Sequence, residues 1–248
     1  MTDECPAYSR TAAIYDELVG EGLFEAWKEN FQRLQAAFKL PLKVCADVAC
    51  GTGMAARFLA ECGARVYAVD ISPQMLEEAE RRTRGLKVEL LRQDLRQLAL
   101  PEKVDLLTCN ADSLNYLLEE GELLLSLARF RENLRPGGYA VFDVNTPYQL
   151  MGQEDGATWE MRLGDMRMYW RSRYDLGSGI ATLEMRHVEE GPDGELCYRE
   201  VHRERGYGKE DVESALREAG FSNAWCWDAA GLAPVSDGTR RLQFLART

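Results

Sequence analysis

The amino-acid sequence predicts an α/β fold built on a doubly wound parallel sheet. Between residues 43 and 145, short apolar runs alternate with segments of helical periodicity, which is the pattern of successive strand and helix units. The same alternation returns after residue 207. A glycine-rich turn follows the first apolar run, as expected where a buried strand passes into a helix.

The first forty residues are predicted to form a helical cap. Apolar residues that include Tyr15 share one helical face. We expect Gly20 and Gly22 to break this helix, because glycine is a poor helix former. A second helical segment follows over residues 23–40, and a proline ends it.

Over the next hundred or so residues, the pattern predicts strands and helices in turn. Ser72 is expected to cap one helix, with Pro73 at its first position. Pro136 and the two glycines after it turn the chain into a further strand. The predicted strands are residues 44–49, 65–70, 86–91, 104–109 and 139–144, and the predicted helices are 52–61, 73–82 and 120–133.

The alternation stops after Asn145. Within residues 158–205 the helical period disappears and apolar side chains alternate with charged ones, which predicts antiparallel hairpins. The strands expected there are residues 168–174, 180–188 and 196–205; a helix at 209–219 and strands at 224–227 and 241–247 follow. We therefore expect one domain, 1–248, with a helical cap (1–40), an α/β core (41–147 and 207–248) and a β insert or lid (148–206).

Composition excludes several classes of protein. The 248 residues carry a net charge of −11, which argues against nucleic-acid and anionic-membrane partners. No stretch approaches the ~20 apolar residues that a membrane helix needs, and the acidic N-terminus is no signal peptide. The 7 cysteines are scattered without a CxxC pair, so the 2 histidines have no cysteine pair near them. We expect reduced cysteines, a cytoplasmic location and no metal site.

The strongest local signal lies between the first strand and the following helix. Gly51 and Gly53 let the backbone approach a ligand there, and the helix N-terminus presents free N–H groups. Asp70 ends the next strand, where a carboxylate can accept both hydroxyls of a ribose. Asp94 follows the third strand, within reach of an adenine amine. A nucleoside ligand is predicted, but residues 51–56 also satisfy the loose dinucleotide pattern, so its identity stays open.

Four spaced motifs resemble class I S-adenosylmethionine-dependent methyltransferases. They are DVACGTG (47–53) with VYAVDIS (66–72), Gln93-Asp94-Leu95, Leu134 to Tyr139, and Arg240 to Arg247. Ala49 stands where the family's first glycine is usual. The resemblance covers residues 40–147 and 207–248, and the β-rich insert after strand five is similar to small bacterial members that act on small molecules. It implies a Rossmann-like seven-stranded sheet with an antiparallel last strand.

The resemblance also implies a cofactor, a reaction and site residues. The cofactor would be S-adenosyl-L-methionine, and the reaction would be direct displacement that moves a methyl group to N or O of a small molecule. Gly51 and Gly53 would face its methionine part, Asp70 its ribose, and Asn110 its ammonium. The cofactor contacts expected are Tyr15, Ala49, Gly51, Gly53, Asp70, Ile71, Met75, Asp94, Leu95 and Asn110.

Catalytic residues are less clearly marked. Tyr15 is a candidate because an aromatic face attracts a sulfonium cation. His202 is a candidate base on a strand that returns to the core, and Asn145 a candidate positioning residue. The other candidate bases are Asp112, Tyr116 and His187. Arg10 and Trp27 are candidates to close the same pocket, with packing as the favoured role of each. Two rival functions stay open: a nicotinamide-dependent oxidoreductase and a non-catalytic S-adenosylmethionine-binding regulatory module.

Overall fold

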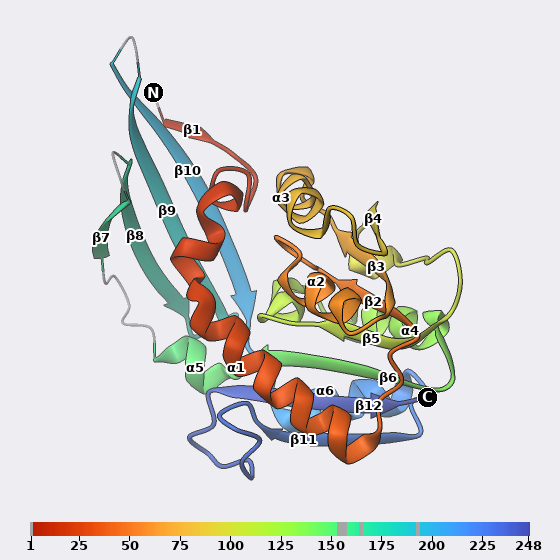
Figure 1. The fold of residues 1–248 in the computed structure, drawn as a ribbon. Coiled ribbons are helices and arrows are strands. Elements are labelled where there is room, and N and C mark those ends of the chain that lie inside the picture. The colour runs from red at the N-terminus through yellow and green to blue at the C-terminus, as the bar shows by residue number, and fades with distance from the viewer. Residues whose placement is uncertain (1, 153–157, 164–165, 192–193) are drawn as a thin grey trace.

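The larger of two sheets forms the core of the protein. The computed structural model describes residues 2–152, 158–163, 166–191 and 194–248. The seven strands of this sheet lie in the order β11-β12-β6-β5-β2-β3-β4 (Figure 1). They are β2 (Val44–Val48), β3 (Arg65–Asp70), β4 (Val88–Arg92), β5 (Val104–Cys109), β6 (Leu134–Asn145), β11 (Asn223–Asp228) and β12 (Arg241–Arg247).

The topology of this sheet confirms the predicted fold class. β12 runs antiparallel to both of its neighbours, β6 and β11, whereas the pairs among β2 to β6 are parallel. Strand order reverses between β2 and β5, which are neighbours although β3 and β4 separate them in sequence. In doubly wound sheets, ligands bind in the crevice at this reversal, beyond the carboxyl ends of the strands.

Helices cover both faces of the sheet. Successive strand residues point to opposite faces, so neighbouring residues pack with different helices. Cys45 packs with α1 (Tyr15–Phe38), α2 (Met54–Glu61) and α3 (Pro73–Thr83), whereas Ala46 packs with α4 (Glu122–Asn133) and α6 (Lys209–Glu218). None of the helices among the described residues is long and apolar enough to span a membrane.

The second sheet stands beside the core and differs from the prediction at both edges. Its order is β1-β10-β9-β8-β7, formed by β1 (Thr2–Glu4), β7 (Thr158–Leu163), β8 (Met166–Asp175), β9 (Ile180–Gly191) and β10 (Gly194–Arg205). The three predicted strands of the insert are present. β7 was not predicted, and β1 lies in the segment expected to be helical. These short edge strands are defined by their partners, β8 and β10, rather than by local pattern.

The predicted break in the N-terminal helix is wrong. α1 runs without interruption from Tyr15 to Phe38, through both glycines, and Figure 1 shows it extending from the second sheet to β11. A glycine costs about 1 kcal/mol in a helix, which tertiary contacts can offset. Asp16 accepts a hydrogen bond of 2.7 Å from Thr52 and pairs with Arg82. Asn30, farther along the helix, donates to the carbonyl of Ala229 at 2.7 Å.

Smaller differences concern element ends. β6 begins at Leu134, before the predicted turn, and a β-bulge between Val104 and Leu106 accommodates this start. Ser72 caps α3 as predicted: its hydroxyl oxygen accepts from the amide of Met75. The short helices η1 (Thr11–Ile14), η2 (Leu95–Gln97), η3 (Ser113–Tyr116) and α5 (Pro147–Met151) were not predicted as separate elements.

Candidate active site

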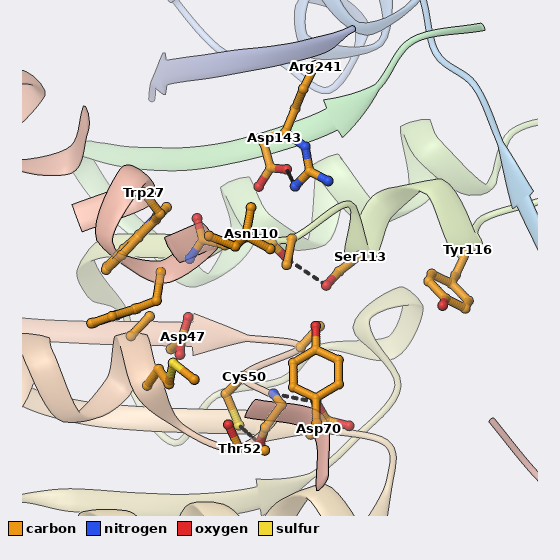
Figure 2. Close-up of a pocket in the computed structure, with 18 of the residues that line it drawn as sticks. Trp27, Asp47, Cys50, Thr52, Asp70, Asn110, Ser113, Tyr116, Asp143 and Arg241 are labelled. Carbon is orange, nitrogen blue, oxygen red and sulfur yellow. Dashed lines mark hydrogen bonds and ion pairs between the residues drawn. The ribbon is translucent and has the colours of Figure 1, made fainter. Parts of the chain in front are cut away.

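A cavity of about 500 Å³ lies at the carboxyl ends of β2, β3, β5 and β6. Side chains of α1 close it from one side, and residues of the loop before β12 and of β12 itself close another (Figure 2). Such a volume is typical of cavities that bind small molecules. Of the residues predicted to bind a cofactor, those that line the cavity are Tyr15, Ala49, Gly51, Asp70, Ile71, Met75, Leu95 and Asn110.

The glycine loop has the backbone conformation that its composition predicts. Ala49, Gly51 and Gly53 have φ values of +54°, +53° and +81°. Ala49 therefore keeps a left-handed conformation where the family usually has glycine. Gly53 does not line the cavity. A Cβ on Gly53 would lie 3.0 Å from the Cβ of Ala79, so this glycine allows the start of α2 to pack closely against α3.

Asp70 connects the glycine loop to the start of α3. One carboxylate oxygen accepts from the amide of Gly51 at 2.8 Å, and the other accepts from the amide of Ser72 at 2.9 Å. Burial raises the pKa of Asp70, although these backbone donors oppose the shift. Each carboxylate oxygen has a second lone pair, so Asp70 can accept two further hydrogen bonds. Ile71 and Met75 line the cavity beside it.

Four buried polar atoms at the end of the cavity away from Tyr116 have no hydrogen-bond partner. They are Asp47 Oδ2, Trp27 Nε1, and both amide atoms of Asn110. All three residues line the cavity, and Figure 2 shows them on the side away from Tyr116. Unsatisfied buried groups are costly, at about 1–3 kcal/mol each. Burial raises the pKa of Asp47 to about 7, against a hydrogen bond of 2.7 Å from Thr108.

These four atoms fit the amino-acid end of S-adenosylmethionine. Asp47 Oδ2 and Asn110 Oδ1 are acceptors that an ammonium would satisfy, and Trp27 Nε1 and Asn110 Nδ2 are donors that a carboxylate would satisfy. Sequence reasoning missed Asp47 and assigned Trp27 to packing. Only the fold reveals that these atoms are buried without partners.

Three tyrosines converge on the cavity from separate segments. Tyr8, Tyr15 and Tyr116 all line it, and the rings of Tyr8 and Tyr15 meet edge to face at 5.8 Å. The hydroxyl groups of Tyr8 and Tyr116 are hydrogen-bonded to each other. Tyr116 Oη also lies 2.9 Å from Nδ1 of His202, which is buried behind it and does not line the cavity. Tyr8 has no motif around it, and sequence reasoning missed it.

Glu200 holds the segment that carries Tyr8. Its carboxylate is 0% exposed and accepts from the amide of Tyr8 at 3.2 Å and from the hydroxyl of Thr11 at 2.9 Å. Its Oε2 lies 3.4 Å from Nε2 of His202. Burial alone would raise the pKa of Glu200, but His202 and the backbone and hydroxyl donors of residues 10 and 11 lower it to about 2. An ionised Glu200 therefore fastens the N-terminal segment to β10.

The remaining predicted site residues lie outside the cavity lining. Asn145 is buried at the end of β6 and donates to two carboxylates. Asp94 caps η2 and pairs with Arg96, with 3.0 Å between Arg96 Nε and either carboxylate oxygen. His187 is 0% exposed, and neither ring nitrogen has a partner. Among the residues that the structure describes, no three His, Cys, Asp or Glu side chains are grouped to hold a metal ion.

Known proteins are similar to this chain in sequence and in fold. Residues 45–138 match the family model described as a methyltransferase domain. A methyltransferase-family protein of Geobacillus sp. (strain WCH70) is 31% identical over 220 residues, covering 87% of this chain and 89% of the relative. This chain belongs to the class I S-adenosylmethionine-dependent methyltransferases.

Two further similarities extend this finding. The dTDP-3-amino-3,6-dideoxy-α-D-glucopyranose N,N-dimethyltransferase of Streptomyces fradiae is 33% identical over 186 residues, covering 71% of this methyltransferase and 69% of the relative. The crystal structure of an S-adenosylmethionine-dependent methyltransferase from Clostridium acetobutylicum ATCC 824 superposes with a TM-score of 0.84. It is 27% identical, and the match covers 97% of this methyltransferase and 98% of that chain. The cofactor is S-adenosylmethionine, and neither the oxidoreductase nor the non-catalytic alternative is supported.

Proposed function

We propose that this methyltransferase moves the methyl group of S-adenosylmethionine to N or O of a small molecule held beside Tyr15 and Tyr116. The observation that carries the proposal is the division of one cavity into two ends. One end has the unpartnered atoms of Asp47, Trp27 and Asn110, and the other has the hydroxyl groups of three tyrosines. The first end suits the amino-acid part of the cofactor, which leaves the second for an acceptor.

Most of the cofactor contacts proposed from the resemblance line the cavity. Asp70 would hold the ribose, Ile71 and Met75 would flank the adenine with Leu95, and Ala49 and Gly51 would allow close approach of the methionine part. Gly53 would not contact the cofactor but would shape the glycine loop that does. Asp94 would reach the adenine only if its carboxylate released Arg96. Bound S-adenosylmethionine supplies an activated methyl group on a positively charged sulfur.

The protein's own contribution is alignment and removal of a proton. Holding an acceptor in near-attack geometry contributes about 7–11 kcal/mol to such a displacement. Tyr15 would present its ring to the sulfonium and its hydroxyl to the acceptor. His202 would act through Tyr116, because Tyr116 Oη joins its Nδ1 to the cavity at 2.9 Å. Asn145 would be a positioning residue, because it does not line the cavity.

The domain organisation and location belong to the same proposal. We infer one catalytic domain in which residues 1–40 cap the cofactor, residues 41–147 and 207–248 form the core, and residues 148–206 roof the acceptor. The seven cysteines are all free, which supports a reducing compartment and hence the cytoplasm. The net charge of −11 supports a small-molecule acceptor rather than a nucleic acid.

Titration calorimetry with S-adenosylmethionine, S-adenosylhomocysteine and NAD, followed by an acceptor panel, tests the proposal. We expect the first two ligands to bind and NAD not to bind. Paired amines and alcohols would then be supplied, with S-adenosylhomocysteine release as the readout. Release with a protein substrate but with no small amine, alcohol or phenol would contradict the proposed acceptor class.

A further inference from the structure

Two carboxylates outside the cofactor contacts share one amide nitrogen. Asn145 Nδ2 donates to Asp112 Oδ2 at 2.7 Å and to Glu204 Oε2 at 3.2 Å. These residues come from the end of β6, the loop after β5 and the end of β10. We propose that Asp112 and Glu204 receive the acceptor as a protonated amine and that Glu204 takes its proton. This inference rests on the proposed function and narrows its acceptor to nitrogen.

The charges around this pair leave room for one more cation. Arg241 lies 2.8 Å from Asp143 and 3.3 Å from Asp112, and Glu204 adds a third carboxylate. Two carboxylates thus pair with one guanidinium, and the third, Glu204, is near enough for its charge to raise the pKa of Arg241. Closely spaced, partly buried carboxylates repel one another, and an added ammonium relieves that repulsion. A neutral alcohol does not.

An unpartnered acceptor atom points to the same kind of ligand. Asn145 is only 4% exposed, and its Oδ1 is buried without a hydrogen-bond partner. Its Nδ2 is fully used by the two carboxylates. The group therefore has one acceptor atom without any donor, Asn145 Oδ1, beside two carboxylates that share a single amide donor. An alkylammonium brings three N–H donors, whereas a hydroxyl brings one.

The pair lies beside the cavity that takes the cofactor. Neither Asp112 nor Glu204 lines that cavity, but Ala111 and Ser113, the immediate neighbours of Asp112, both do. Asp112 is the charge that contributes most to the raised pKa of Tyr15, after burial. Glu204 is similarly the charge that contributes most to the raised pKa of Tyr116, after burial. An amine at this pair is therefore next to the tyrosine hydroxyls at the acceptor end.

The proton balance of the step is simple. One N–H bond of the ammonium breaks, its electron pair stays on nitrogen as the attacking lone pair, and the proton forms an O–H bond on Glu204. Burial and the charge of Asp112 raise the pKa of Glu204 to about 7, which makes it a stronger base than an ordinary carboxylate. The groups that face it are Asp112 after β5, Tyr116 on η3 and Arg241 on β12, with His202 two residues before it on β10.

Binding experiments separate this inference from the proposed function. The probes are two matched pairs, cyclohexylamine with cyclohexanol and benzylamine with benzyl alcohol. Each is titrated by NMR into the protein saturated with S-adenosylhomocysteine. We expect each amine to bind at least 10-fold more tightly than its alcohol. Glu204→Gln and Asp112→Asn are each expected to reduce this preference at least 5-fold without changing S-adenosylhomocysteine affinity.

Glu184→Gln is the matched control. Glu184 lies on β9 and pairs with Arg199 at 3.1 Å, on the face of the sheet opposite to Glu204. It should leave the amine preference intact. Amines that bind no better than their alcohols, or a preference that survives both site substitutions, would overturn the inference. Failure of the unmodified protein to bind S-adenosylhomocysteine would instead reject the proposed function.

A pH profile distinguishes a proton acceptor from a structural role. With an amine that the enzyme methylates, kcat should rise through pH 7 in the unmodified protein. Glu204→Gln should lower kcat at least 100-fold and remove that rise, while the protein stays folded and keeps its S-adenosylhomocysteine affinity. A Glu204→Gln enzyme that keeps the same pH profile would show that another group takes the proton.

Discussion

The amide of Gly51 donates a hydrogen bond of 2.8 Å to the carboxylate of Asp70. The glycine loop after β2 and the acid that ends β3 therefore form one unit, although 19 positions separate them in sequence. The same carboxylate holds the amide of Ser72 at the start of α3. A ligand that reaches Asp70 thus meets a surface that is already arranged.

Replacement of Asp70 tests the proposed ribose contact. Asp70→Ala is expected to weaken S-adenosylhomocysteine binding about 100-fold or more, because hydrogen bonds to a charged group contribute about 1.5–3 kcal/mol each. Asp70→Asn, which keeps one acceptor oxygen, should lie between this variant and the unmodified protein. Calorimetry measures both. An affinity that is unchanged in Asp70→Ala would remove Asp70 from the ribose.

The close packing at Gly53 can be separated from its backbone strain. Gly53→Ala places a Cβ 3.0 Å from Ala79 Cβ and 3.1 Å from Ala79 Cα, at a φ of +81°. Gly63→Ala is the control, because its φ is +96° and no atom lies within 4 Å of the added Cβ. Urea unfolding should show a loss of about 1 kcal/mol for Gly63→Ala and about 2 kcal/mol more for Gly53→Ala. Equal losses would mean that α2 and α3 move apart freely.

The unpartnered amide of Asn110 predicts opposite effects on stability and on binding. Asn110→Leu should raise the free energy of unfolding of the ligand-free protein by about 1–3 kcal/mol, because it removes two unsatisfied buried atoms. The same change should weaken S-adenosylmethionine binding at least 10-fold. Urea unfolding and calorimetry measure the two effects.

Asn115→Leu is the control for that comparison. The side-chain amide of Asn115 is fully hydrogen-bonded. Its Nδ2 donates to the backbone carbonyls of Asn145 and Arg205 at 2.9 and 2.7 Å, and its Oδ1 accepts from the backbone N–H of Asn145 at 2.9 Å. Its loss leaves buried backbone groups without partners, so this variant should be destabilised by about 2 kcal/mol or more. If both variants are destabilised alike, Asn110 is satisfied in solution and is not reserved for a ligand.

The sequence predicted the core sheet because its strands are set by local pattern. A strand buried on both faces is a short apolar run, and residues 65–70 and 104–109 match β3 and β5 residue for residue. β7 pairs with the next strand, β8, but its residues are almost all exposed, so no alternation of buried and exposed positions marks it. β1 is an edge strand whose partner, β10, lies far along the chain, so no local signal marks it. Gly20 and Gly22 misled the prediction for the same reason, since α1 is held by contacts with distant residues such as Thr52 and Ala229.

The candidate site divides in a similar way. Gly51 and Asp70 belong to a spaced motif, so their approach follows from the order of strands and helices. Trp27 and Glu200 carry no motif that distinguishes them from packing or surface residues, and Asp47, although it opens the glycine motif, was assigned no role. Trp27 and Asp47 stand out because each has a buried polar atom without a hydrogen-bond partner. Glu200 stands out because its buried carboxylate accepts several hydrogen bonds. Satisfaction of hydrogen bonds is a property of the folded chain, and a single sequence does not encode it locally.

The buried carboxyl of Asp47 predicts how stability depends on pH in the ligand-free protein. Burial raises its pKa from 3.8 to about 7, so between these values the folded state holds a proton that the unfolded chain has lost. The contribution of Asp47 to the free energy of unfolding is fully present below about pH 4 and is lost as the pH rises through 7. Asp70, Asp143 and Glu204 also have raised pKa values and act in the same direction.

Asp47→Asn isolates the contribution of this one group. Asparagine keeps an oxygen that can accept from Thr108, which donates to Asp47 at 2.7 Å. Urea unfolding between pH 5 and pH 8 should show that the unmodified protein loses on the order of a few kcal/mol more than Asp47→Asn, since one pKa unit corresponds to about 1.4 kcal/mol. Parallel curves for the two proteins would mean that Asp47 is hydrated or paired in solution. It would then not be held, as the structure has it, with a free oxygen for the ammonium of the cofactor.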